Sequence, residues 1–532
     1  MKEKHIHINA ESSQKFLHYF LLGLTVLLSV FIRCRYLTLP LERDEGEYAY
    51  AGLQIRNGYA AYENVYNMKF PGAYFFYALI FLFSHSLVFI RLCFLIVHLS
   101  QVYILFFITR NLMKDYKPAV YTCIIYILLT SSFSSFGLLG KAEPFAVLFF
   151  LAGLYLLIRQ TVNSKEKKSM FVFAGLLFGC CFLIKQNCLL FSLMAAAYIL
   201  FYAENKLRSL LYFITGFIIP IMLLIAHLWI EGTFTNFRFF TIDYARQYGG
   251  IVSFKTGWGI FRFELDKLLM YNNYIFIIGA CGVIYMFFAS IKSGKFRFII
   301  IWAICSLIAF SAGYYFRPHY FLLVYPSFAI AGGVLLYEIS AFKFLKIAPL
   351  ITICFFIFSF IRLQTDYIFK DNSVTTMHKM YIWTPFPECI PIAEHIKEIT
   401  NENAKIGMIG NEPEIAFYAD RELASGYLYL YPFFENQEYA LQMTHQFIDE
   451  MEKNAPEIMI FSNVSWDATK NKKCEKIIED WWESYKIHYS LEESVCSDSD
   501  EGVKFFTTQE PKAFFTHWVA CIKVYKKINA VQ

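Results

Sequence analysis

The alternation of apolar and polar positions divides the 532-residue chain into two unlike parts. Up to about residue 363, long apolar runs are separated by short polar breaks, and many of these runs approach the ~20 residues that a helix needs to cross a bilayer. From about residue 367 onward charged residues are frequent and no such run occurs. We therefore predict a membrane domain over 1–365 and a soluble domain over 366–532.

The pattern predicts about eleven membrane-spanning helices in the first part. Their ranges are 17–36, 86–109, 117–138, 143–159, 169–186, 188–203, 208–230, 272–291, 297–314, 319–338 and 347–364. Lys69 and Pro71 introduce one more apolar stretch, of about 14 residues, which is too short to cross. We expect it to form an interfacial helix in an exterior loop.

Lysine and arginine collect in every second break between these ranges. The residues are Arg110, Lys114, Lys117, Arg159, Lys165, Lys167, Lys168, Lys206, Arg208, Lys292, Lys295, Arg297, Lys343 and Lys346. Basic breaks face the cytoplasm in most membrane proteins, which places the N-terminus in the cytoplasm. With eleven spans, the soluble domain and the long loops 37–85 and 231–271 then lie outside. The first apolar run is longer than that of a signal peptide and has no small-residue cleavage site after it, so we expect it to be retained as a span.

The soluble part alternates helical and strand patterns. Helical patterns occur in "AEHIKEIT", "QMTHQFIDEMEKN" and "CEKIIEDWWESY", and strand patterns occur in "KIGMIG", "EIMIFS", "KIHYSL" and "WVACIKVYKKI". This order predicts a small α/β domain in which Trp481 and Trp482 are core residues. The segment "MIGNEPEIAFYADRELAS" either helps to bind an acceptor or is a connecting loop, and we favour the loop. Four cysteines, Cys389, Cys474, Cys496 and Cys521, allow up to two disulfides in three possible pairings.

Composition agrees with an integral membrane protein. Hydrophobic residues make up 57% of the chain and charged residues 17%, against about 25% charged in soluble domains. The sequence has no Walker motif and no dinucleotide-binding glycine motif, and nothing in it suggests a nucleic-acid surface.

The segment "LERDEGEYAY", residues 41–50, directly follows the first span. Asp44 and Glu47 are spaced like an N-cap and its N3 partner, so one interpretation is a capping box that opens a short helix. The other is that an acid at the membrane surface carries out chemistry. Glu45 and Tyr48 of the same segment are further candidates.

Ionisable residues recur at the exterior ends of the later spans. They are Lys69 in "NMKFPGAYFFYAL", Glu143 in "KAEPF", Lys185 and Gln186 in "LIKQN", and Arg317 and His319 in "RPHYFLLVYP". A charge near hydrocarbon costs roughly 2.5–3.5 kcal/mol, so Lys185 and Glu143 are expected to pair or to serve a ligand. Lys69, Arg317 and His319 could equally be interfacial anchors.

Charges of both signs at a membrane surface suit a substrate that has an anionic group and a proton to lose. Lysine and arginine bind a lipid phosphate, and a nearby carboxylate serves as a general base toward a hydroxyl. A transporter of lipid-linked saccharides, such as a flippase or exporter, is the main alternative, although it should place ionisable residues near the midplane. A ligase that moves a whole glycan from a diphosphate lipid is a second alternative, and a structural scaffold is the least favoured.

The acidic segment 41–50 and the four later motifs, which contain Lys69, Glu143, Lys185 and Arg317, occur in an order that resembles the multi-span GT-C glycosyltransferases. The resemblance covers about 1–365 and is greatest to the bacterial branch related to protein O-mannosyltransferases and to the transferase that adds aminoarabinose to lipid A. It implies a polyprenyl-phosphate sugar donor, inverting transfer on the exterior face, and a bacterial inner-membrane location with a periplasmic or extracellular C-terminal domain. The acceptor, whether glycan, lipid A or protein, and the sugar stay open.

The resemblance also implies roles for individual residues. Asp44 matches the catalytic base, Glu143 a second acid, and Lys69 the donor-phosphate lysine, while Lys185, Gln186, Arg317 and His319 match positions near the donor site. Two departures are Glu47, where the lipid A enzymes have arginine, and Met68, where they have an acid. No cofactor is required by the sequence, although carboxylates such as Asp44 and Glu143 could hold a divalent cation.

Overall fold

A computed structural model describes residues 2–162, 166–293, 296–382, 384–463, 471–498, 502–507 and 520–528. The chain forms two compact units, each built from separate stretches of sequence. Unit 1 comprises Met1–Leu37, Val88–Leu224 and Ser253–Asn372, and unit 2 comprises Thr38–Leu87, Ile225–Val252 and Ser373–Gln532. Some residues of the predictions lie outside the described ranges. They are Lys165, Lys295 and the first two residues of the last predicted strand, Trp518 and Val519.

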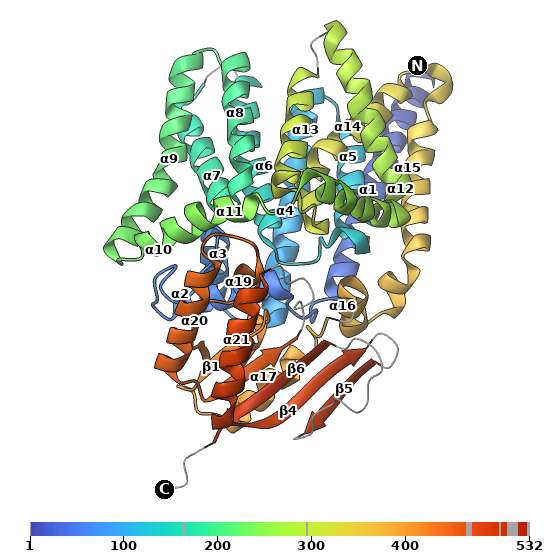
Figure 1. Cartoon of the computed structure of the whole chain (residues 1–532). Helices are drawn as coiled ribbons and strands as arrows, with labels where there is room; N and C mark the ends of the chain where they lie inside the picture. Colours follow the sequence, from blue (N-terminus) through green and yellow to red (C-terminus); the bar gives the residue numbers. More distant parts are fainter. Residues whose placement is uncertain are drawn as a thin grey trace. The chain divides into compact units, whose positions relative to one another are not determined.

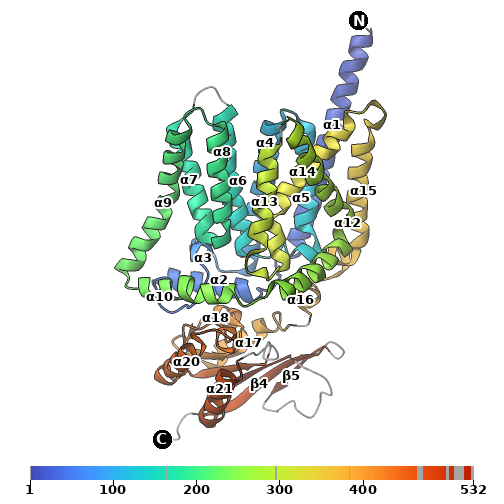
Figure 2. The same cartoon turned by 45° about the horizontal axis from the view of Figure 1, so that its top comes forward.

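Unit 1 is a bundle of apolar helices (Figure 1). Its long helices are α1 (Lys2–Arg35), α4 (Leu87–Met113), α5 (Tyr116–Ser131), α6 (Ala142–Val162), α7 (Lys168–Ile184), α8 (Leu189–Tyr202), α9 (Lys206–Ile230), α12 (Phe254–Ser293), α13 (Arg297–Phe310), α14 (Tyr325–Ser340) and α15 (Ala348–Leu363). Short helical turns are η1 (Phe133–Ser135), η2 (Gln186–Cys188), η4 (Ala312–Tyr314), η5 (Pro318–Leu323), η6 (Lys343–Leu345) and η7 (Asp366–Lys370). Figure 2 shows α7, α8 and α9 running close together.

Each of the eleven predicted ranges contains a helix. Among the described residues, six helices are long and apolar enough to cross a membrane: Ser13–Arg35, Leu87–Met113, Ala142–Thr161, Lys206–Ile230, Phe254–Lys292 and Lys343–Leu363. The other ranges hold shorter helices, since α5 ends at Ser131, α7 at Ile184 and α13 at Phe310. The chain is thus a multi-pass membrane protein, and the count of eleven crossings stays a prediction.

The predicted span 272–291 is the second part of a longer helix. Helix α12 begins at Phe254, and its backbone departs from helical geometry at Asn272, with φ −136° and ψ 17°. The Asn272 amide donates a hydrogen bond of 2.7 Å to Ser132 Oγ, at the end of α5. The break at Asn272 therefore coincides with the predicted start of the span.

Unit 2 combines helices of the two long loops with the C-terminal α/β domain. The loop helices are α2 (Arg43–Arg56), α3 (Gly72–Phe81), α10 (Phe234–Arg238), the π-helix η3 (Phe239–Tyr244) and α11 (Ala245–Gly249). The helices of the C-terminal part are α16 (Ser373–Tyr381), α17 (Cys389–Ile399), α18 (Pro413–Ala419), α19 (Tyr431–Phe434), α20 (Ala440–Asn454), α21 (Lys472–Tyr485) and η9 (Lys486–His488). The short helix expected after Lys69 is α3, with 10 residues, and its interfacial position stays a prediction.

The strands of unit 2 form one mixed sheet. They are β1 (Lys405–Ile409), β2 (Glu422–Leu423), β3 (Ile458–Ser462), β4 (Tyr489–Asp498), β5 (Gly502–Thr507) and β6 (Ala520–Lys527), in the order β2-β1-β3-β6-β4-β5. Strand β1 pairs in parallel with β2 and β3, whereas β6 pairs antiparallel with β3 and β4. The α/β domain expected from the alternating patterns is confirmed.

The core of unit 2 lies between this sheet and two amphipathic helices, α20 and α21, which run side by side across the sheet (Figure 1). Met443, Phe447 and Met451 repeat at the spacing of one helix face on α20 and are buried. Trp481 and Trp482 are buried in the same core, as predicted. Phe240 of the loop helix η3 also packs in this core, so the second long loop and the C-terminal part share apolar contacts.

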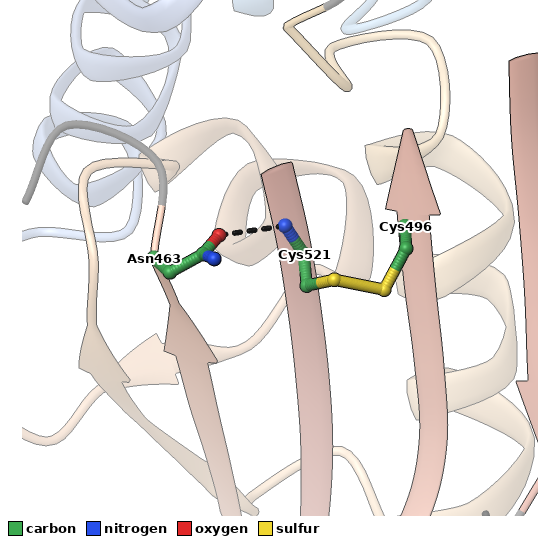
Figure 3. The surroundings of a disulfide bond; sticks show 3 residues. All are labelled: Asn463, Cys496 and Cys521. Atoms are coloured by element: carbon green, nitrogen blue, oxygen red, sulfur yellow. Dashed lines mark hydrogen bonds between the residues drawn. A yellow bond between two sulfur atoms is a disulfide. The ribbon is translucent and has the colours of Figure 1, made fainter. Parts of the chain in front are cut away.

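One disulfide joins neighbouring strands of the sheet (Figure 3). Cys496 on β4 is bonded to Cys521 on β6, and the Asn463 side chain accepts a 2.6 Å hydrogen bond from the Cys521 backbone N–H. Cys389 and Cys474 are free thiols and are buried. The sequence left three ways of pairing the four cysteines open. The Cys496–Cys521 bond belongs to the pairing in which Cys389 would be bonded to Cys474, and that second bond is not formed.

The segment "MIGNEPEIAFYADRELAS" is not a plain connecting loop. It contains α18 and β2, and Ile415, Ala416 and Ala419 of α18 are buried. Two acids of this segment, Glu412 and Glu414, are also fully buried. Burial raises the pKa of Glu412, although the Arg43 guanidinium opposes the shift. Burial, and then repulsion from Glu412, raise the pKa of Glu414 well above its ordinary value.

The raised pKa of Glu414 predicts how stability depends on pH. A carboxyl whose pKa is higher in the folded chain favours the fold below the unfolded pKa of about 4.3, and this contribution is lost as the pH rises through the folded pKa. Glu414→Gln, which cannot ionise, is therefore expected to unfold at a higher temperature than the wild type at pH 8 and at the same temperature as the wild type at pH 4. The measurement is the midpoint of thermal unfolding of the purified protein at both pH values.

The control is Glu398→Gln, which makes the same change on the exposed side of α17. It should leave the midpoint unchanged. An unfolding midpoint of Glu414→Gln that lies below that of the wild type at pH 8 would contradict the assignment of Glu414 as a destabilising buried acid.

Candidate active site

Helix α2 carries the acidic segment and begins at Arg43. Its N-cap is Glu42, whose side chain accepts a 3.0 Å hydrogen bond from the Glu45 N–H, while the Glu45 carboxylate accepts one of 3.3 Å from the Glu42 N–H. A capping box is present, as predicted, but it is formed by Glu42 and Glu45, and the assignment of Asp44 and Glu47 to it is wrong. The helix begins earlier than expected because Glu42 has extended backbone angles and Arg43 is already helical.

This start places Asp44 and Glu47 on one face of α2, because residues three apart lie above one another on a helix. The Lys69 ammonium lies between the two carboxylates. Its Nζ is 2.8 Å from Asp44 Oδ1 and 2.6 Å from Glu47 Oε2. Lys69 therefore relieves the repulsion between two like charges on adjacent turns.

The two acids differ in their surroundings. The Glu47 side chain is 0% exposed, whereas that of Asp44 is 29% exposed. Glu47 Oε1 accepts a 2.5 Å hydrogen bond from the Tyr74 hydroxyl on α3, and Oε2 accepts one of 2.7 Å from the Tyr429 hydroxyl in the C-terminal part. With Lys69, Glu47 thus has three donors, as a buried carboxylate needs.

The surroundings of Lys69 keep it charged. Its Nζ lies 4.7 Å from the centre of the Tyr48 ring, which adds a cation–π contact on the face of α2 that carries Asp44. Burial alone lowers the pKa of Lys69, but Asp44 and Glu47 raise it well above the ordinary value. The cluster of Asp44, Glu47, Lys69 and Tyr48, which we call the acid–lysine cluster, carries one net negative charge.

The C-terminal part of unit 2 holds α2 in place along its length. The Leu41 N–H donates to the Tyr418 hydroxyl at 2.7 Å, and Arg43 Nε donates to the Asn411 carbonyl at 2.9 Å. Further along, the Tyr50 hydroxyl accepts a 2.8 Å hydrogen bond from the Leu423 N–H. These contacts fix the orientation of the helix that carries both acids.

Close packing of α2 against α18 requires a glycine at position 46. A Cβ added at Gly46 would lie 2.7 Å from both the Cβ and the backbone N of Glu414. Gly46 therefore permits the acidic helix and α18 to approach at this distance.

A second cluster forms in unit 1 around Glu143. Lys185 Nζ lies 2.5 Å from Glu143 Oε1, and His319 Nε2 is 3.7 Å from the same oxygen. Lys185 also lies 4.3 Å from the centre of the Tyr320 ring. Glu143 is at the start of α6, Lys185 caps the C-terminal end of α7, and His319 is on η5, so three separate elements meet here. Glu143 and Lys185 were expected to pair or to serve a ligand, and the structure shows that they pair with each other.

The remaining three candidate residues are not among those that define the two clusters. Arg317 is exposed, and its guanidinium lies 5.9 Å from the centre of the Tyr315 ring. Gln186 is half-buried and begins η2. Glu45 is fully buried and caps α2.

Sequence reasoning missed the two tyrosines that bind Glu47. Tyr74 follows Lys69 by five residues in the quoted motif, so its position beside Lys69 was a usable signal. Tyr429 is separated from Glu47 by 382 residues, and nothing in the chain pattern of "YLYLYP" indicates the contact.

Comparison with known proteins supports the resemblance. The family model for dolichyl-phosphate-mannose-protein mannosyltransferases matches residues 69–230. None of the curated protein sequences matches the chain.

Solved structures of two transferases share the fold. Cupriavidus metallidurans ArnT bound to undecaprenyl phosphate has a TM-score of 0.58 at 14% identity, over 94% of this chain and 97% of ArnT. Its apo form has a TM-score of 0.52 at 13% identity, over 97% and 98% of the two chains. The archaeal oligosaccharyltransferase AglB from Archaeoglobus fulgidus, in complex with an inhibitory peptide and a dolichol-phosphate, has a TM-score of 0.55 at 12% identity, over 93% and 75%. The chain therefore has the fold of ArnT and AglB.

The close approach at Gly46 predicts the effect of a single added methyl group. Gly46→Ala should lower the free energy of unfolding by about 1–3 kcal/mol, because Glu414 backbone atoms have to move to admit the Cβ. Gly23→Ala on α1 is the control, since a Cβ there meets nothing within 4 Å. Thermal unfolding of both variants checks this, and equal midpoints for the two would contradict the packing argument.

Proposed function

We propose that this protein transfers a sugar from a polyprenyl-phosphate donor to a hydroxyl of a glycan, lipid A or protein acceptor. The transfer takes place on the exterior face of the bacterial inner membrane and inverts the anomeric carbon. The observation that supports this most strongly is the acid–lysine cluster, in which a partly exposed carboxylate and a charged, partly exposed ammonium are 2.8 Å apart. The Asp44 carboxylate can accept the proton that the acceptor hydroxyl loses. The Lys69 ammonium can stabilise the negative charge that the donor phosphate gains.

Asp44 is the better candidate for the general base. A base must reach the hydroxyl of the acceptor, and the Asp44 side chain is partly exposed whereas that of Glu47 is fully buried. Glu47 already accepts hydrogen bonds from Lys69, Tyr74 and Tyr429. We therefore assign proton transfer to Asp44 and the holding of Lys69 to Glu47.

In the proposed step, the acceptor oxygen attacks the anomeric carbon and its proton passes to Asp44. The bond between the anomeric carbon and the phosphate oxygen breaks, and its electron pair leaves with the polyprenyl phosphate. Lys69 stabilises that oxygen through a charge that is already in place, so little reorganisation is needed in the transition state. ArnT and AglB were each solved with a polyprenyl-type phosphate bound, which supports this donor class.

The second cluster supports an additional role for unit 1. Lys185, Arg317 and His319 are the proposed donor-phosphate residues of this unit. Glu143 is buried and contacts both Lys185 and His319. We propose that Glu143, besides its role as a second acid, fixes these two groups.

The Cys496–Cys521 disulfide supports an exterior position of the C-terminal domain. Disulfides persist in oxidising compartments such as the periplasm and are rare in the cytosol. This agrees with the side of the membrane that the positive-inside pattern assigns to the domain.

We propose that a divalent cation is not needed between Asp44 and Glu47, because the Lys69 ammonium occupies that position at 2.8 and 2.6 Å. Transfer by purified enzyme should therefore retain its rate within about twofold after treatment with EDTA. A loss of more than tenfold that Mg²⁺ or Mn²⁺ restores would contradict this proposal.

The function itself is tested by incubating the purified enzyme with a membrane lipid extract. Mass spectrometry would record the loss of one polyprenyl-phosphate sugar and the appearance of free polyprenyl phosphate. Asp44→Asn should bind the donor and reduce its consumption by about 100-fold or more, the usual range for loss of a general base. Because asparagine is nearly isosteric with aspartate, this variant removes the proton acceptor and keeps the shape of the side chain.

Glu47→Gln is the matched comparison on the same helix face. It leaves the base in place but removes one anion from Lys69, so we expect weakened donor binding as well as slower transfer. Consumption of the donor by Asp44→Asn at the wild-type rate would rule out Asp44 as the base. If the wild type consumes no lipid-linked sugar in an acceptor-rich extract although it is folded, the transferase proposal is wrong, and a transporter of lipid-linked saccharides becomes the better interpretation.

A further inference from the structure

We infer that Tyr429, from the C-terminal domain, is a positioning residue of the acid–lysine cluster. It acts through Glu47 on Lys69 and Asp44. The first long loop therefore supplies the charged residues of the site, and the C-terminal domain supplies a residue that positions them. The inference rests on the proposed function and extends it to a residue far away in the sequence.

The Tyr429 hydroxyl lies between two atoms of the acidic helix. It is 2.7 Å from Glu47 Oε2 and 3.1 Å from the Arg43 carbonyl oxygen, and its single proton is available to either acceptor, with the Glu47 contact the shorter. Lys69 Nζ contacts the same carboxylate oxygen at 2.6 Å. One oxygen of Glu47 thus joins the tyrosine of the C-terminal domain to the lysine of the first long loop.

Glu47 requires such a donor because its carboxyl group is fully buried. A buried carboxylate loses its hydration, and each missing hydrogen bond favours its protonated form. The titratable groups that face Glu47 are Asp44 on its own helix, Lys69 and Tyr62 in the loop, Tyr74 on α3, and Tyr429 and Tyr431 of the C-terminal part. Of these, Lys69, Tyr74 and Tyr429 donate hydrogen bonds to its carboxylate.

Removal of the Tyr429 hydroxyl should therefore make Glu47 easier to protonate. A protonated Glu47 no longer attracts the ammonium, and Lys69 loses one of the two anions that set its position beside Asp44. Activity would then be lost at a higher pH than in the wild type. A tyrosine that merely filled space would not shift the pH at which activity is lost.

Tyr427 provides a matched control two residues away. It is also buried, but its hydroxyl donates to Gln446 at 2.9 Å and makes no hydrogen bond to Glu47 in the described structure. Tyr427→Phe and Tyr429→Phe thus each remove one buried hydroxyl from the same segment. Of the two, Tyr429→Phe removes a hydrogen bond to the acid–lysine cluster.

The experiment measures sugar transfer from the polyprenyl-phosphate donor between pH 4.5 and 9 for the wild type, Tyr429→Phe and Tyr427→Phe. Tyr429→Phe should reduce the rate about tenfold at pH 7, as expected for a hydrogen bond to a charged group. The acidic limb of its pH–rate profile, where the transfer rate falls on acidification, should move to higher pH by about one unit. Tyr427→Phe should keep the acidic limb of the wild type. If Tyr429→Phe does not fold, 3-fluorotyrosine at position 429 replaces it, and this stronger donor should move the limb down.

The outcomes separate the inference from the proposed function. An active wild type with a shifted acidic limb in Tyr429→Phe alone supports the inference. Unshifted limbs in both variants, or equal shifts in both, overturn it and leave the transferase function standing. A folded wild type that neither binds polyprenyl phosphate nor consumes the donor overturns the proposed function, and the inference falls with it.

Discussion

The structure of the first long loop depends on one ammonium group placed between two carboxylates. Asp44 and Glu47 lie on the same face of α2, and two unneutralised acids at this spacing would repel each other and destabilise the helix. Lys69 comes from the segment after α2, so its ion pairs tie the start of α3 to the acidic helix. The two ion pairs raise the pKa of Lys69, and the contact with Lys69 fixes the position of Asp44. The proposed sugar transfer uses both effects.

This arrangement is possible because two acids with similar chemistry have different environments. Glu47 is buried and has three donors, one of them from the C-terminal domain, whereas Asp44 is partly open. In the proposed function, the buried acid holds Lys69 and the partly open acid is the one that a substrate reaches. The Gly46 contact with α18 and the hydrogen bonds of Leu41, Arg43 and Tyr50 then explain why a C-terminal α/β domain packs on a loop helix.

Much of this could be predicted from the sequence, because each successful inference used neighbouring residues or strong periodicity. Apolar runs located the helices of unit 1, and alternating patterns located the sheet and its covering helices. The motifs contained Asp44, Lys69, Glu143 and Lys185, which the structure places in two clusters, while their roles stay predictions. The start of α2 was misassigned because Glu42 and Asp44 are both acidic and each has an acid three residues later. Tyr429 could not be found, since its contact with Glu47 depends on tertiary packing across 382 residues.

In the proposed function, the phosphate of a polyprenyl lipid binds beside Lys69 and Asp44. Photo-crosslinking tests it most directly, with a polyprenyl phosphate that carries a diazirine next to the phosphate and with labelled peptides identified by mass spectrometry. We expect labels within residues 43–56 and 69–81, and we expect competing polyprenyl phosphate to suppress them. Labels confined to the basic breaks, such as 341–347, would contradict it.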